Sequence, residues 1–255
     1  MSDKTPKYFT PSGAGQFATT RWSVILAAGD SASAQHEPAL DTLCQTYWFP
    51  LYAYLRRRGY DTHEAEDYTQ GFFAGILERK GLQRADPKCG KFRSFLLACL
   101  KNFLADEWDR ARTQKRGGDK KVLSLDFDAA ASRYEREPAD CLSPEKLFER
   151  SWALTVLTRA MDRLKAESAA PLGVLGTSDK QRLFDHLKVY LTAEKDAGSY
   201  RDVAGELGMT EGSVKVAVHR LRRRYRELVR EEIAQTVTTE AQVDEEIRDL
   251  FAALA

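Results

Sequence analysis

Apolar residues recur at spacings of three and four along most of the chain, as in Leu40, Leu43, Tyr47, Leu51 and Tyr54. Residues at this spacing lie on one face of an α-helix. The pattern predicts helices over 38–58, 63–80, 91–116, 179–193 and 240–254, a short one containing Trp22, one beginning at Ser143-Pro144, and two that meet at Gly208. No segment of any length alternates with the period of a strand. We therefore predict an all-α fold.

Residues with special backbone chemistry indicate where these helices begin, end or break. Asp61 or Thr62 can cap the helix that follows, and Gly59 ends the one before it. Pro144 is placed at a first helical position, where its missing N–H costs nothing. Pro50 lies inside the 38–58 helix, where proline removes a backbone hydrogen bond, so we expect a bend or a break there.

Two segments interrupt the helical pattern and suggest the domain boundaries. Residues 1–19 are rich in Pro, Gly, Ser and Thr and are expected to form a disordered leader. Residues 119–143 lose the periodicity and carry several carboxylates, which is typical of a linker. The predicted organisation is a helical domain over 20–118, the linker, a second helical domain over 144–236, and an acidic helix over 237–255.

Composition narrows the possible classes of protein. Hydrophobic residues make up 43% of the 255 residues, enough to bury a core. Lys and Arg number 39 and Asp and Glu 38, so the net charge of +1 predicts no partner by itself. We see no signal-peptide core and no run of about 20 apolar residues. We therefore expect a cytosolic protein with no membrane partner.

The cysteines and histidines show no pattern of a metal or catalytic site. Cys44, Cys89, Cys99 and Cys141 form no CxxC pair, and no histidine completes a zinc spacing. An even number allows a disulfide, but we expect reduced structural thiols, with Cys99 buried in an apolar helix. No nucleophile elbow, phosphate loop or dinucleotide motif is present. We expect a protein that is not an enzyme and needs no metal or cofactor.

Residues 200–224 have the spacing of a helix-turn-helix. Ala204 precedes Gly208 by four residues, and Val214 follows that glycine by six. The small alanine lets two helices cross closely, the glycine takes the left-handed turn, and the valine packs the second helix onto the first. Thr210 can cap the second helix.

The second helix of this motif has an apolar stripe and a basic face. Val214, Val218, Leu221, Tyr225 and Leu228 share the stripe. Off it lie basic and small side chains that can reach phosphates, guanine edges and thymine methyls. The residues that we expect to contact DNA are Ser213, Lys215, Val216, Ala217, His219, Arg220, Arg223 and Arg224. A solvated charged helix is the simpler alternative, but the turn spacing and the basic face coincide in one segment, which favours DNA binding.

A second constellation lies in the first half of the chain. Residues 64–73 read EAEDYTQGFF, and residues 90–97 read GKFRSFLL, followed by Lys101, Asn102 and Arg110. Together with the helix-turn-helix, these motifs resemble the sigma-70 family in its extracytoplasmic-function (ECF) group. The amino-acid sequence of these motifs is also similar to that of sigma-like proteins of planctomycete-type bacteria. The resemblance covers about Ala39 to Gly118 and Trp152 to Ile233.

The resemblance implies two helical regions that act on RNA polymerase and promoter DNA. In the family, region 2 docks an acidic helix on the clamp of core polymerase, and Glu66, Asp67 and Gln70 match that motif. The alternative is that these carboxylates only favour the helix start. The family often has Glu after the Gln, where this chain has Gly71. Region 4 places its second helix in the minus-35 major groove.

The resemblance also implies that the start of the long helix holds the minus-10 element. The matching residues are Lys91, Phe92, Arg93, Phe95, Lys101, Asn102 and Arg110. Aromatic side chains stack on unpaired bases and cations hold the backbone. The family often has Trp where Phe95 stands, and Phe92 and Phe95 have the helical spacing of core residues. Their role as base platforms therefore competes with simple packing.

Other segments depart from the compact family pattern. Residues 169–197 are longer than usual, and the acidic tail after Ile233 is extra; the tail could pack on region 4 or shield its basic face. In the family the linker runs toward the RNA exit path, where acidic residues could imitate nucleic acid, but a solvated tether is the simpler interpretation.

Two alternatives stay open: a stand-alone helix-turn-helix regulator, and a degenerate sigma-like protein that binds polymerase without starting transcription. Control by an anti-sigma protein or a regulatory kinase also stays open.

Overall fold

The computed structural model describes residues 22–30, 32–78, 81–86, 90–113, 125, 127–136, 142–169, 177–191 and 199–255. Within these ranges the secondary structure is helical and includes no strand, so the predicted all-α fold is confirmed. The α-helices are α1 (Ser23–Gly29), α2 (His36–Arg57), α3 (Thr62–Glu78), α4 (Phe92–Thr113), α5 (Phe127–Glu135), α6 (Pro144–Ala169), α7 (Thr177–Leu187), α8 (Tyr200–Leu207), α9 (Glu211–Ala234) and α10 (Glu240–Leu254), with short 3-10 turns η1 (Gly81–Arg84) and η3 (Lys188–Leu191). The predicted leader, residues 1–19, lies outside the described residues.

The helix starts follow the capping chemistry of the sequence. The Asp61 N–H donates to Glu64 Oε2 at 3.0 Å, and the Glu64 N–H donates back to Asp61 Oδ1 at 2.8 Å. This reciprocal pair is a capping box, so Asp61 rather than Thr62 caps α3. The expected break at Pro50 does not occur, because α2 continues through this residue. Pro50 and its neighbours Phe49 and Leu51 are buried, and their packing outweighs the missing hydrogen bond.

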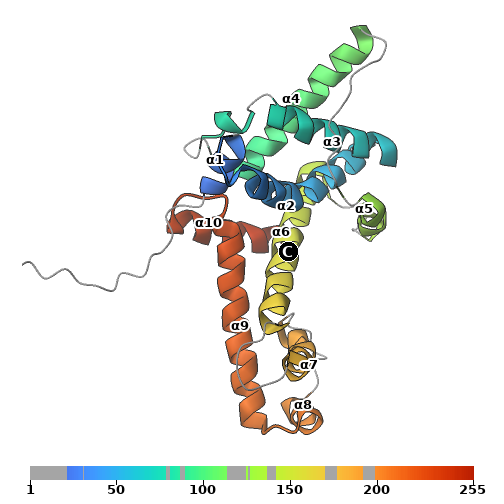
Figure 1. The fold of residues 1–255 in the computed structure, drawn as a ribbon. Coiled ribbons are helices and arrows are strands. Elements are labelled where there is room, and N and C mark those ends of the chain that lie inside the picture. The colour runs from blue at the N-terminus through green and yellow to red at the C-terminus, as the bar shows by residue number, and fades with distance from the viewer. Residues whose placement is uncertain are drawn as a thin grey trace, which may run out of the picture.

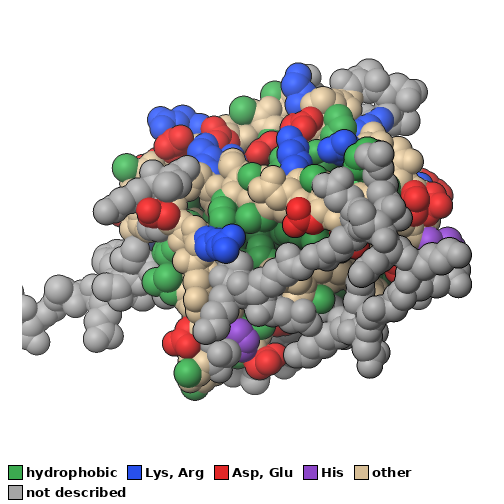
Figure 2. Space-filling model, turned by 90° about the horizontal axis from the view of Figure 1, so that it is seen from above, with side chains coloured by type: hydrophobic (Ala, Val, Ile, Leu, Met, Phe, Trp, Pro, Cys, Tyr) green, Lys and Arg blue, Asp and Glu red, His purple; other side chains and the backbone are tan. Residues whose placement is uncertain are grey.

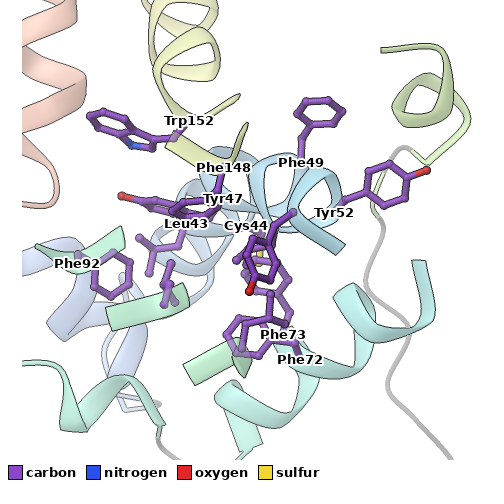
Figure 3. Packing of buried hydrophobic residues seen from close by; sticks show 14 of the residues in the cluster. Leu43, Cys44, Tyr47, Phe49, Tyr52, Phe72, Phe73, Phe92, Phe148 and Trp152 are labelled. Carbon is purple, nitrogen blue, oxygen red and sulfur yellow. The ribbon is translucent and has the colours of Figure 1, made fainter. Parts of the chain in front are cut away.

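The centre of the molecule is α2, which packs against helices from both halves of the sequence. Tyr47, Leu51 and Leu55 are almost completely buried in it. The Phe92 ring of α4 lies edge-on to the Tyr47 ring, with 5.5 Å between their centroids. Figure 3 shows Phe148 and Trp152 of α6 near the same tyrosine. The core of the first predicted domain therefore includes the beginning of the second.

Helix α6 belongs to two cores in succession. Its first half buries Leu147, Phe148 and Trp152 against α2, and its second half buries Leu164 with Leu228 of α9. Figure 1 shows α6 and α9 side by side, running from the α2 core to α7 and α8 at the far end. In this arrangement α6 connects the two predicted domains. The division of the chain into two domains stays a prediction.

The predicted linker contains a packed helix, α5. The Phe127 ring lies 5.5 Å from the Trp48 ring, Ala130 is completely buried, and the Arg133 guanidinium carbon lies 3.6 Å from the centre of the Phe49 ring. The interpretation as a solvated tether is therefore wrong for residues 127–135. The segment is rich in carboxylates, but it also contains apolar residues at helical spacing, namely Phe127, Ala130 and Tyr134.

In the described part of the chain, no helix has the length and apolar content needed to cross a membrane, and no group of His, Cys, Asp and Glu could hold a metal ion. Cys44 is free and buried, and burial raises the pKa of its thiol to about 12. Cys99 is also free but only half-buried, which corrects the expectation of a fully buried thiol; Cys89 and Cys141 lie outside the described residues.

Candidate nucleic-acid interface

Helices α8 and α9 form the predicted helix-turn-helix. Gly208 follows α8 in the left-handed conformation, with φ 63° and ψ 30°. The Met209 N–H donates to the Ala204 carbonyl at 2.9 Å and closes the end of α8. The Thr210 hydroxyl accepts a hydrogen bond from the Ser213 N–H at 3.2 Å and caps α9. The turn glycine and the cap are therefore confirmed.

A small core of its own holds this motif in shape. Val203 and Ala204 of α8 pack with Val214 and Val218 of α9, and all four are buried. The Arg222 guanidinium donates to the Tyr190 carbonyl at 2.8 Å and ties α9 to η3. Because one side of α9 is fixed in this way, its opposite side faces solvent.

That solvent-exposed side carries most of the residues predicted to contact the minus-35 element. Val216 keeps 51% of its surface exposed, an unusual value for a valine in a folded domain. The exposed set is Ser213, Lys215, Val216, His219, Arg220 and Arg223, called the α9 face below. The Lys215 ammonium pairs with Glu211 at 2.7 Å, one turn earlier on the same helix. Ala217 is partly buried against the motif's own core and is less accessible.

Arg224 is held apart from the α9 face. Its guanidinium pairs with Glu167 of α6 at 2.6 Å, and with Glu227 and Glu231 at 3.2 Å each. The hydrogen bond from Arg224 is the main reason that the pKa of Glu167 lies below its ordinary value. In this arrangement Arg224 fastens α9 to α6, and its predicted contact with DNA has no support from its position.

The aromatic residues predicted to hold the minus-10 element lie in or beside the core. Phe92 is 2% exposed, and its ring lies 6.0 Å from that of Trp22. Phe95 is half-buried and stacks on Phe92, with 6.0 Å between centroids and 28° between planes. Packing is therefore the role that the geometry shows for Phe92, while Phe95 retains a partly exposed edge.

Arg93 and Lys91 are engaged by acidic residues of α6 and α10. The Arg93 guanidinium donates to Glu149, Glu246 and Asp249, and it lies over the Trp152 ring at 4.3 Å. Lys91 pairs with Glu245 at 3.3 Å and also with Asp249. Only 4% of the surface of Arg93 remains exposed. Arg93 is therefore not accessible to DNA in this arrangement, while Lys91 is paired but keeps 27% of its side chain exposed.

The remaining minus-10 candidates lie farther along α4. The Lys101 ammonium pairs with Glu145 of α6 at 2.9 Å, and this hydrogen bond lowers the pKa of Glu145. Asn102 is exposed, and the side chain of Arg110 lies outside the described residues. Viewed from the end of the molecule where α3 and α4 lie, basic, acidic and hydrophobic side chains are interspersed (Figure 2).

The acidic residues predicted to dock on polymerase lie on α3. Asp67 is exposed, while Glu66 and Gln70 are half-buried. Glu66 lies near His63, with 3.9 Å between its carboxylate and Nδ1. Gly71 is buried, next to the core residue Phe72. Gly71, where the chain departs from the family pattern, therefore lies on the packed side of α3.

A known protein shows sequence similarity to most of the chain. The chain is similar to an ECF sigma factor. It is 24% identical over 217 residues to the ECF RNA polymerase sigma factor SigE of Mycolicibacterium smegmatis, an alignment that covers 85% of this chain and 70% of that protein. No protein-family model and no solved structure matches the chain. The likeness supports a relation to ECF sigma factors at low identity.

The sequence pattern did not predict the ion pairs that join the two long helices α6 and α9. Glu232 of α9 is buried between Arg159 at 3.0 Å and Arg163 at 2.7 Å, both from α6. The two arginines are four residues apart, which places them on one face of α6. This spacing was a usable signal, but it did not identify the partner helix.

Proposed function

We propose that this protein is a sigma factor that binds core RNA polymerase and directs it to minus-35 and minus-10 promoter elements to start transcription. The observation that carries the proposal is the α9 face, a capped, solvent-exposed basic surface at the end of a chain whose alignment with an ECF sigma factor spans 217 residues. Such a surface alone fits many DNA-binding regulators. The acidic motif of α3 and the α4 motif in the same alignment favour a sigma factor.

The α9 face would read the minus-35 element from the major groove. Arg220 and Lys215 can contact phosphates or guanine edges, and Val216 can contact a thymine methyl. The side of α9 that must stay on the protein is the buried stripe of Val214 and Val218. The exposed side of α9 would therefore contact DNA, while its buried side holds the helix on the protein.

Region 2 would supply polymerase binding and the minus-10 contacts. Glu66, Asp67 and Gln70 would dock on the polymerase clamp, and Lys91, Arg93, Phe95, Lys101, Asn102 and Arg110 would hold the unwound strand. Because Arg93 is buried here, this step requires α6 and α10 to leave the start of α4. Polymerase would then hold the two regions apart, and two weak DNA sites would gain effective concentration on one promoter.

Finer features of the resemblance belong to the same proposal. A relation to planctomycete-type sigma-like proteins is a narrower part of this proposal. The protein would act through binding alone, without a cofactor or a catalytic step of its own. Control by an anti-sigma protein or a regulatory kinase is compatible with this assignment and is not needed for it.

A stand-alone helix-turn-helix regulator is the second candidate. The observation that favours it is the accessibility of the α9 face while α6 remains packed on both α2 and α9. A regulator of this kind would bind duplex DNA at two-fold symmetric sites as a dimer, without polymerase. Footprints with and without polymerase would separate the two candidates.

Equilibrium binding to purified bacterial core polymerase tests the proposal. We expect the wild type to bind tightly and Asp67→Arg to bind at least about tenfold more weakly, or about 1.4 kcal/mol. Asp162→Arg, which reverses an exposed charge on α6, is the matched control and should bind like the wild type. Absence of binding by all three proteins would overturn the sigma factor proposal and leave the stand-alone regulator.

A further inference from the structure

The acidic helix α10 reaches two cations at the start of α4 with its carboxylates, beside a pocket that Lys91, Glu245 and Glu246 line. In the α4–α10 ion cluster, Arg93 Nη2 lies 2.9 Å from Asp249 Oδ2, and Arg93 Nη1 pairs with Glu246. The side chains of Arg93 and Glu246 are each only 5% exposed. Lys91 completes the contact by pairing with Glu245 at 3.3 Å. These carboxylates bind the cations as the oxygens of a phosphate backbone would.

The charges of this cluster do not balance. Among the described residues, the two cations Lys91 and Arg93 face four carboxylates, those of Glu149, Glu245, Glu246 and Asp249. An excess of negative charge is not what a purely stabilising ion cluster needs, because like charges close together repel one another. It is the charge that a substitute for nucleic acid would carry.

Helix α10 is preformed and held in this position. It begins with a capping box in which Thr239 and Gln242 satisfy each other's backbone donors. Its apolar side buries Val243 and Leu250 in the main core. Its other charged side is tied to Arg230 of α9, which pairs with Asp244 at 2.6 Å and with Glu240 at 3.0 Å.

The tail does not cover the α9 face, as a shield of region 4 would. It contacts α6 and the C-terminal half of α9, and Figure 1 shows the α8–α9 turn at the opposite end of that helix. Its contacts with α6 and α9, both within the predicted second domain, agree with the expectation of packing on that domain rather than with a shield of its basic face. The carboxylates instead meet the residues assigned to the minus-10 strand.

We propose that α10 is an internal competitor for the promoter strand: in the free protein Glu246 and Asp249 occupy Lys91 and Arg93, and strand capture requires their release. The inference rests on the proposed function, because that function assigns these two cations to DNA. A site that is open only part of the time lowers the apparent affinity in proportion to the open fraction. The free protein therefore binds single strands weakly until α10 leaves.

The competition can be measured on the full chain with a matched pair of variants. Glu246→Gln/Asp249→Asn removes two carboxylates that face Lys91 and Arg93. Glu240→Gln/Asp244→Asn removes two carboxylates from the same helix that face Arg230 instead, with the same change in net charge. The probe is a fluorescein-labelled, mixed-sequence single strand of DNA, which reports contacts to the backbone.

We expect the first double variant to bind this probe about tenfold more tightly than the wild type at the same salt concentration. The control should gain about twofold or less, because exposed ion pairs contribute little. Equal affinity of the two variants would overturn the proposal, since net charge alone would then explain any gain. This comparison contains no polymerase, so its failure is distinct from a failure of the wild type to bind core polymerase.

Hydrogen exchange on the wild type provides a second test that does not depend on the folding of a variant. The backbone amides of α10 should be protected in the free protein and lose protection in the complex with core polymerase and promoter DNA. Unchanged protection of α10 in that complex would overturn the proposal, because the helix would then remain on α4 while DNA is bound.

Discussion

Arg93 and Trp152 lie against each other, with the guanidinium carbon 4.3 Å from the centre of the indole ring. One residue belongs to α4 and the other to α6, on opposite sides of the segment 119–143. Trp152 is 2% exposed and shares a core with Tyr47 and Phe92. The two halves of the chain are therefore joined by packing as well as by charge, and this arrangement has measurable consequences.

Replacement of Trp152 should destabilise both halves of the free protein together. We expect Trp152→Ala to lower the free energy of unfolding by about 3–5 kcal/mol, since it leaves a cavity in the shared core. Trp108→Ala is the matched control, because Trp108 is 63% exposed and its loss should cost about 0.5 kcal/mol or less. Urea denaturation followed by circular dichroism measures both. Two separate transitions, with only one affected by Trp152→Ala, would contradict the shared core.

Two glycines of the helix-turn-helix should respond to alanine in opposite directions. Gly208 has φ 63°, so Gly208→Ala should cost about 1–2 kcal/mol through left-handed strain. Gly205 lies inside α8 with no atom within 4 Å of an added Cβ, so Gly205→Ala should add about 0.5–1 kcal/mol. Thermal unfolding of the two variants gives the signs. A Gly208→Ala variant as stable as the wild type or more stable would contradict the left-handed turn, and a destabilised Gly205→Ala would contradict the open position in α8.

Two arginines one turn apart on α9 should have different roles. Arg220 is exposed on the α9 face, so Arg220→Ala should weaken binding to duplex DNA with little change in stability. The slope of log binding constant against log salt concentration should fall by about one. Arg224 pairs with three carboxylates, so Arg224→Ala should chiefly destabilise the packing of α9 on α6. Fluorescence anisotropy over a range of salt concentrations, together with the melting temperature, separates the two effects. A stronger loss of DNA binding in Arg224→Ala would reverse the assignment.

Acid should weaken the contact between α6 and α9. Hydrogen bonds from Arg224 lower the pKa of Glu167 from its ordinary 4.5. Burial alone would raise the pKa of Glu231, but its pairs with Arg163 and Arg224 outweigh burial, and the pKa of Glu231 is also lowered. A lowered folded pKa contributes stability above the unfolded value and loses it as pH falls through the folded one. We expect stability to fall below about pH 4.5, and less steeply in Glu167→Gln. An identical acid profile for this variant would show that Glu167 does not carry the effect.

Local features of the fold followed from the sequence because their causes are local. The left-handed turn depends on Gly208, and the start of α9 depends on the Thr210 hydroxyl, both within a few residues of the effect. The buried stripe through Val214 and Val218 follows from helical spacing alone. The α9 face could be predicted for the same reason, except for Arg224, whose partner Glu167 lies on another helix.

Features that depend on long-range packing could not be predicted in this way. An apolar stripe shows that a helix face is buried but not which helix covers it, so the packing of Trp152 near Phe92 was not foreseen. Arg93 stands among apolar residues in the sequence, yet its partners Glu149, Glu246 and Asp249 are distant in the chain. Its burial follows from their positions in space.

Transcription in vitro is the most direct test of the assignment as a sigma factor. Core polymerase would be mixed with the protein and a library of bacterial genomic fragments, and the 5′ ends of the transcripts would be mapped. We expect new 5′ ends that depend on the protein, share sequence elements near minus-10 and minus-35, and disappear with Asp67→Arg but not with Asp162→Arg. Tight polymerase binding without any new 5′ ends would contradict the assignment and identify a sigma-like protein that occupies polymerase without starting transcription.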